Sequence, residues 1–171
     1  MKVMISRSRV VPLATVAAML LAVAAPQFAE AQKKGMTWSV LQTKPTNGTV
    51  RVGCKVGCDP YKGDTPCTTP LRLLCVRKSG AGFPLPPPPT FNNSDRYNKW
   101  VGGIIGTTKA MAPPALLAGA NKACVAEFGP DWRVAEFHDG WGWAFWGYGA
   151  FGNPTQRARV HINDQNANCW K

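Results

Sequence analysis

The residues that could carry out acid–base or metal chemistry lie in two short segments near the C-terminus. Glu136, His138 and Asp139 fall within four positions, and His161 and Asp164 follow in a later segment. A histidine beside a carboxylate can act as a general base or as a metal ligand. A hydrolase built on these residues requires His138 and His161 to meet in one pocket. The first segment is equally typical of a strand that ends in an Asp-Gly turn.

No recognised catalytic motif accompanies these residues. The chain has no His-Glu-x-x-His sequence, no nucleophile elbow and no Cys-His signature. We therefore expect a non-catalytic binding protein with no catalytic residue, no metal and no cofactor. A small secreted hydrolase that uses a His138/His161 cluster is the alternative.

Six cysteines indicate disulfides. They are Cys54, Cys58, Cys67, Cys75, Cys124 and Cys169. An even number in an exported chain favours three disulfides. We expect the first four to pair among themselves and Cys124 to pair with Cys169. Zinc binding by the first four is an alternative, but their spacing is irregular for a zinc ribbon. Asp59 and Asp64 offer too few carboxylates for calcium.

The first 31 residues have the features of a secretory signal peptide. Three basic residues precede an apolar segment at 13–25, and residues 29–31 fit the small-x-small cleavage motif. The apolar segment is shorter than the roughly 18 residues that a membrane span needs, so an uncleaved anchor is the less favoured alternative. We expect cleavage before Gln32 and a secreted or periplasmic protein without a membrane span.

The rest of the chain is basic. The signal contains three of the 20 basic and one of the 9 acidic residues, so residues 32–171 carry a formal charge of +9. This charge serves solubility, and it also favours anionic surfaces such as lipid headgroups, wall polymers or acidic glycans. Nucleic acid is disfavoured because the chain is exported and has no basic helix or RNA-binding signature.

A proline-rich segment, FPLPPPP at 83–89, divides the chain. Consecutive prolines cannot join a helix or a central strand, and they favour the polyproline II conformation. We predict a proline-rich linker at 83–90 between a β-rich, cysteine-rich segment at 32–82 and an α+β aromatic-rich domain at 91–171. Such a segment can also lie flat on a domain surface.

Strands are expected in the 32–82 segment. Residues 37–41 and 49–52 alternate between apolar and polar types on either side of Asn47-Gly48, a strong hairpin signal. Residues 71–76 are typical of a buried strand. About 50 residues bury little core, so we expect disulfides to stabilise this part.

A helix and three strands are expected after the proline-rich segment. Pro113-Pro114 begins the helix and Gly129-Pro130 ends it. Its apolar face contains Leu117, Ala120, Cys124 and Phe128. The strands are expected at 132–137, in the aromatic run that follows, and at 157–164, where apolar and polar residues alternate.

The aromatic run, HDGWGWAFWGYGAFGNP at 138–154, contains six Trp, Tyr or Phe residues among glycines. In a strand, Trp141, Trp143 and Phe145 share one face, and Trp146 and Tyr148 share the other. Aromatic side chains bury about 150–250 Å² each, so this run can supply most of a small core. Stacking on sugar rings is the alternative, and both hold if one face is core and the other surface.

Residues 97–171 resemble bacterial C-type lectin-like domains. The resemblance rests on Ala120-Asn121-Lys122-Ala123-Cys124 in a helix, then Gly129 and Trp132-Arg133-Val134, and finally Asn163-Asp164 followed by Cys169. It implies a small, disulfide-stabilised α+β domain in which one main helix packs on antiparallel strands. The Glu-Pro-Asn or Gln-Pro-Asp triplet of calcium-dependent sugar binding is absent from this sequence.

The expected ligand-binding residues lie on the outward faces of the last two strands or directly after them. They are Trp146, Tyr148, Arg159, His161, Asn163 and Asp164. We expect an exported recognition or surface-interaction module that binds carbohydrate or an anionic cell-surface polymer. A purely structural envelope protein has the same sequence features.

Overall fold

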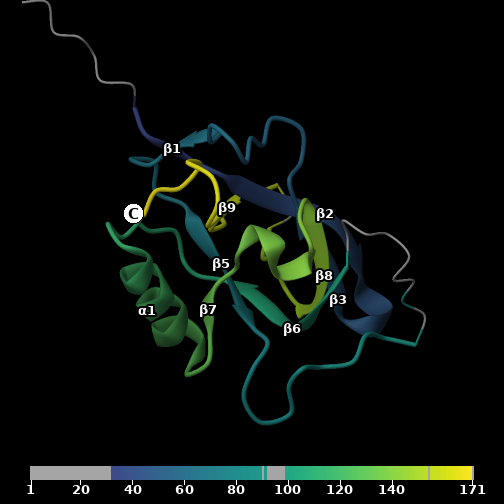
Figure 1. Ribbon diagram of the computed structural model, residues 1–171. Helices are drawn as coiled ribbons and strands as arrows, with labels where there is room; N and C mark the ends of the chain where they lie inside the picture. The colour runs from purple at the N-terminus through teal and green to yellow at the C-terminus, as the bar shows by residue number, and fades with distance from the viewer. Residues whose placement is uncertain (1–31, 90, 92–98, 154, 171) are drawn as a thin grey trace, which may run out of the picture. The chain divides into compact units, whose positions relative to one another are not determined.

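A closed six-stranded β-barrel forms the core of the structure, a computed structural model that describes residues 32–89, 91, 99–153 and 155–170 (Figure 1). The predicted signal peptide at 1–31 lies outside the described residues. Ala31–Lys171 form one compact unit. In chain order the elements are β1 (Lys34–Gly35), β2 (Thr37–Lys44), the 3₁₀ turn η1 (Pro45–Asn47), β3 (Thr49–Gly53), β4 (Thr65–Pro66), β5 (Arg72–Arg77), β6 (Trp100–Thr107), α1 (Leu117–Phe128), β7 (Arg133–Val134), the 3₁₀ turn η2 (Phe137–Gly140), β8 (Ala144–Gly149) and β9 (Ala158–Arg159).

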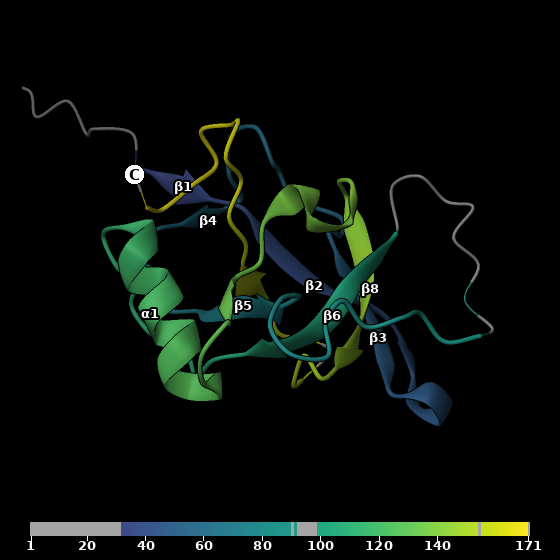
Figure 2. The same cartoon turned by 60° about the horizontal axis from the view of Figure 1, so that its bottom comes forward.

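The barrel strands follow the order β6–β8–β3–β2–β9–β5, and pairing of β5 with β6 closes the ring. The β6–β8 and β5–β9 pairs are parallel. The other four pairs are antiparallel. β7 adds to β5, whereas β1 and β4 form a separate two-stranded sheet (Figure 2).

Alternating apolar residues fill the barrel. Because side chains alternate between the two faces of a strand, every second residue points inward. The buried cluster includes Trp38, Val40, Val50, Val52, Leu74, Val76, Val101, Ile105 and Phe145. β5 is buried on both faces, since Leu73 and Cys75 belong to a second cluster with Ala120 and Cys124 of α1. This double burial explains its continuous apolar sequence.

The predicted fold class is wrong. The described part of the chain is mostly β, with a single α-helix on the outside of the barrel beside β5 and β7 (Figures 1 and 2). The lectin-like arrangement of one main helix on antiparallel strands is therefore not observed. Local patterns identified several strands, but the ring depends on pairings between distant segments.

The predicted division into two parts does not match the strand topology. β2, β3 and β5 come from residues 32–82, whereas β6, β8 and β9 come from 91–171, and all six share one barrel. Residues 83–89 are not a spacer between domains. They lie on the barrel, where the Leu85 amide donates to the Gly102 carbonyl of β6 at 2.8 Å.

The predicted disulfide pairing is also wrong. The bridges are Cys54–Cys58, Cys67–Cys169 and Cys75–Cys124. Cys75 lies on the outer face of β5 and Cys124 on the buried face of α1, so this bridge fastens the helix to the barrel. All four closely spaced cysteines are in disulfides, which removes the zinc alternative.

The first hairpin is confirmed, and the helix is confirmed except at its start. α1 begins at Leu117, after the predicted Pro113-Pro114, and ends at Phe128, with Gly129 as its C-cap. The predicted face includes its buried residues Ala120 and Cys124. β2 and β3 form an antiparallel hairpin around Asn47-Gly48, where Gly48 has a φ of 67°. The strands predicted at 132–137 and 157–164 are shorter, because only β7 and β9 keep ladder pairing.

Trypsin can test the pairing, because each cysteine lies in its own tryptic peptide. Non-reducing digestion should link peptide 52–55 to 56–62, 63–72 to 160–171, and 73–77 to 123–133. A linked pair of 123–133 and 160–171 would restore the sequence-based pairing and contradict this topology.

Removal of each bridge should destabilise the protein according to the loop it closes. The Cys67–Cys169 and Cys75–Cys124 bridges join residues 102 and 49 positions apart, whereas Cys54 and Cys58 are 4 apart. Chain entropy predicts losses in unfolding free energy of about 5, about 4 and about 2 kcal/mol for the three double Cys→Ser variants. Guanidinium denaturation measures them, and equal losses would contradict the prediction.

Candidate functional site

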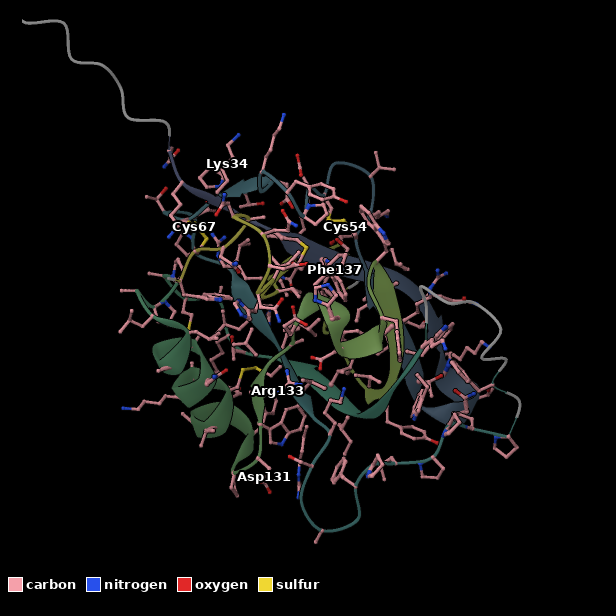
Figure 3. All side chains as sticks on the ribbon, in the orientation of Figure 1. Lys34, Cys54, Cys67, Asp131, Arg133 and Phe137 are labelled. Atoms are coloured by element: carbon pink, nitrogen blue, oxygen red, sulfur yellow. A yellow bond between two sulfur atoms is a disulfide. The ribbon has the colours of Figure 1, made fainter. Side chains whose placement is uncertain are left out.

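The segment from Arg133 to Trp143 begins with β7, leads to β8 and contains the capped 3₁₀ turn η2. Figure 3 labels Arg133 and Phe137 within it. The Glu136 carboxylate accepts a hydrogen bond from the His138 amide at 2.7 Å, and the Asp139 carboxylate accepts one from the Glu136 amide at 2.8 Å. This reciprocal capping satisfies backbone donors that a short 3₁₀ turn leaves free. The Asp-Gly sequence predicted as a turn therefore forms η2.

Asp139 anchors the turn from within. Its side chain is only 5% exposed and accepts two hydrogen bonds from Arg133, at 2.9 and 2.5 Å, and one from Lys78 at 3.2 Å. Burial acts to raise the pKa of Asp139, but the hydrogen bond and charge of Arg133, the Glu136 amide and Lys78 together hold it below its ordinary value. The carboxylate is thus a fixed negative charge.

His138 lies between two carboxylates at the surface. Its Nδ1 is 2.9 Å from Glu136 Oε1, and its Nε2 is 3.6 Å from Asp164 Oδ2. The imidazole helps to line a cavity of about 170 Å³ with Tyr61 and Phe137. The Asn163 amide also donates to Glu136, at 3.3 Å. The loop at 163–164 is therefore held beside the turn.

His161 faces a different cavity, of 290 Å³, lined also by Arg133, Glu136 and Asp139. Its Nδ1 lies 3.0 Å from Trp170 Nε1 and 3.0 Å from Asn168 Oδ1. The two histidines thus line separate cavities, and Glu136 both contacts His138 and lines the cavity of His161.

Two indoles on this turn face solvent. Trp141 is 66% exposed and Trp143 is 41% exposed. Trp141 has a φ of 71°, a conformation that bulky residues rarely adopt. Such strain persists only where surrounding contacts enforce it. Here the Trp141 amide donates to the His138 carbonyl at 3.0 Å, closing the turn.

Neighbouring segments support both indoles. Lys99 Nζ lies 5.1 Å from the centre of the Trp141 ring, a cation–π contact. The Trp143 ring packs edge-on against Phe137 at 5.7 Å, and its carbonyl accepts the Cys54 amide at 2.8 Å. The Cys54–Cys58 loop therefore adjoins the turn. We call Trp141 and Trp143, with Lys99, the Trp platform.

The six residues predicted to bind a ligand do not form one surface. Asn163 and Asp164 are exposed beside the turn, and His161 lies in the separate cavity. Trp146 is 8% exposed and packs against Phe91, while the Tyr148 hydroxyl donates to Pro86.

Arg159 is a buried structural group. It is 1% exposed and donates to the carbonyls of Pro66 and Thr69, both at 2.7 Å, and to Cys169 Sγ at 3.0 Å. Burial lowers the pKa of Arg159, and the charge of Asp64 acts in the opposite direction. Strand alternation placed this residue outside, but its guanidinium satisfies backbone carbonyls around the β4 segment.

The sequence interpretation treated Trp141 and Trp143 mainly as core. Only Phe145 of that expected face is buried in the barrel, where it packs against Trp38 at 5.2 Å. A local signal distinguishes the exposed Trp141 and Trp143 from the buried Phe145: Asp139-Gly140 is turn sequence, and strand pairing starts only at Ala144.

Within the described residues, no group of three or more His, Cys, Asp or Glu side chains is arranged to hold a metal ion. The same part of the chain has no helix long and apolar enough to cross a membrane. Comparisons with known proteins give no match to a family model, a curated protein or a solved structure.

Replacement of Asp139 by Asn should destabilise the protein in a pH-dependent way. At pH 7 we expect a loss of about 2–3 kcal/mol in unfolding free energy, because Arg133 and Lys78 lose their charged partner. The folded-state pKa of Asp139 is below its unfolded value of about 3.9, so its contribution is present above that pH and is lost as the pH falls through the folded pKa.

Urea denaturation at pH 7 and pH 2.5 measures this difference, which should shrink at the lower pH. Asp131→Asn is the matched control, since Asp131 is more exposed, lies 3.8 Å from Arg77 and has a positive φ that Asn also tolerates. It should cost less than about 1 kcal/mol. An equal effect of Asp139→Asn at both pH values would contradict the assigned role.

Proposed function

We propose that this protein is an exported, non-catalytic recognition module that binds an anionic glycan of the cell envelope or its surroundings through the Trp platform. The observation that carries the proposal is the pair of exposed indoles on a turn whose backbone is fixed by buried charge. Two exposed aromatic rings two residues apart, on a turn held by hydrogen bonds, are a candidate binding surface.

The chemistry of the platform fits a sugar ring. Indole faces stack on the C–H faces of pyranose rings, and an aromatic ring contributes much contact area at low entropic cost. Lys99 lies over the Trp141 ring, so its ammonium is placed beside any ring stacked nearby. A sugar carboxylate or sulfate in that position gains a charge-assisted contact.

The charge of the chain supports the same ligand class. Residues 32–171 carry a formal charge of +9, which attracts polyanions at long range. Export is supported by the predicted signal peptide and by the three disulfides, which form and persist in oxidising compartments. Secretion and periplasmic location are both compatible with these features.

Calorimetric titration with a hexamer of galacturonic acid tests the proposal. Trp141→Ala and Trp143→Ala should each weaken binding about tenfold, which corresponds to about 1.4 kcal/mol. Lys99→Gln should weaken it several-fold, because one cation beside the sugar is lost. Maltohexaose, which is uncharged, should bind more weakly than the uronic acid hexamer.

Lys122→Gln is the matched charge control, because Lys122 is exposed on α1 and its loss changes the net charge equally. It should change the affinity less than twofold at 150 mM salt, where surface charges more than about 8 Å away are screened. If Lys99→Gln and Lys122→Gln weaken binding equally, and the Trp variants bind normally, attraction is by net charge alone and the proposed site is wrong.

A further inference from the structure

The connection between β5 and β6 is much longer than its geometry requires. The two strands pair directly and run antiparallel, with Arg77 opposite Ile104. A turn of a few residues can join such a pair, yet residues 78–99 separate them. Part of this connection, the segment FPLPPPP at 83–89, lies on the barrel, and we call it the strap.

One backbone acceptor and two side-chain donors on the barrel hold the strap. The Leu85 amide donates to Gly102 at 2.8 Å, and Trp100 Nε1 donates to the Leu85 carbonyl at 2.7 Å. The Tyr148 hydroxyl donates to the next carbonyl, that of Pro86, at 3.3 Å. Two successive strap carbonyls thus accept hydrogen bonds from an indole and a phenol on neighbouring strands.

The surface under the strap is aromatic and leaves room for close approach. The Trp100 and Tyr148 rings pack edge-to-face with centroids 4.8 Å apart. Gly102 has a φ of 79°, and a Cβ there would lie 3.3 Å from Pro84 Cβ. We call Trp100, Gly102 and Tyr148 the aromatic cradle.

The cradle matches the chemistry of a proline-rich segment. Five of the seven strap residues are proline and have no amide hydrogen, so the strap cannot form a regular backbone ladder, and side-chain donors satisfy the Leu85 and Pro86 carbonyls instead. Aromatic grooves that supply such donors recognise polyproline II segments in general, because the preformed helix loses little entropy on binding.

We propose that the aromatic cradle is a recognition site for proline-rich segments, and that the strap is its resident intramolecular ligand. The strap closes the site in the isolated chain, and its release opens the cradle to a proline-rich segment of a partner protein. This site uses different side chains from the Trp platform, so either can fail without the other.

Covalent attachment gives the strap an effective concentration of about millimolar. The intact chain should therefore bind a free proline-rich peptide weakly. When the strap is weakened, the same peptide should bind more tightly, because it no longer competes with a tethered copy.

The experiment uses the full mature chain and the peptide GAGFPLPPPP, which corresponds to residues 80–89. In one variant GSGSGSG replaces residues 83–89, and in a milder one Leu85→Gly weakens the strap alone. Fluorescence anisotropy of labelled peptide should show at least tenfold tighter binding to the strap-replaced variant than to the wild-type chain. The Leu85→Gly variant should bind at least threefold tighter, and GAGFALAAAA should not bind.

Trp100→Phe, made in the strap-replaced variant, should weaken peptide binding at least tenfold, because it keeps a ring and removes the donor. Trp132→Phe is the matched control, since Trp132 stacks on Phe128 and lies outside the cradle. If the strap-replaced variant does not fold, the Leu85→Gly variant decides the question. A folded strap variant that binds the proline peptide no better than the wild-type chain, or no better than the alanine peptide, overturns the proposal.

Discussion

A single buried carboxylate holds the candidate site together. The Asp139 carboxylate accepts hydrogen bonds from Lys78, which directly follows β5, from Arg133 of β7 and from the Glu136 amide of its own turn. A charge removed from water is stable only while its partners stay in place, so these three segments are fixed relative to one another. The turn ends in Trp141, which has a left-handed backbone and donates its amide hydrogen to the His138 carbonyl. The exposed indoles are thus displayed by a rigid scaffold, which lowers the entropic cost of binding.

The barrel supports the segments that Asp139 holds together. β5 pairs with β6, β7 and β9, and it is buried on both faces, so it links the barrel interior to the helix layer. The Cys75–Cys124 bridge fastens that layer covalently, and Cys67–Cys169 fastens the C-terminal segment near β4. Each of these bridges joins a cysteine before the proline-rich segment to a cysteine after it. The parts before and after it therefore depend on each other for stability.

Local signals in the sequence predicted α1 and the β2–β3 hairpin, because a helical apolar face and an Asn-Gly turn are short-range features. The ring of strands was not predictable in this way. Its parallel pairs join β5 to β9 and β6 to β8, and no short-range pattern specifies such partners.

Among the site residues, the sequence pattern singles out His138, Asp139 and Asp164, which do lie around the turn. Alternation places Trp141 inside, but Trp141 ends a turn rather than lying in a strand. Trp146 does lie in β8, and it is buried because Phe91 and Lys44 cover its ring. Alternation also predicts a surface position for Arg159, because it does not reveal which polar side chains satisfy buried carbonyls.

Chemical-shift mapping of the indole N–H groups tests the central claim most directly. The chain has seven tryptophans, each with one indole resonance, so each reports on its own site. On titration with the galacturonic acid hexamer, the account predicts that the Trp141 and Trp143 resonances shift most, with a common saturation curve. Trp38 in the barrel and Trp132 beside α1 should stay unchanged. Shifts confined to other indoles, or none at Trp141 and Trp143 under conditions where calorimetry detects binding, would contradict it.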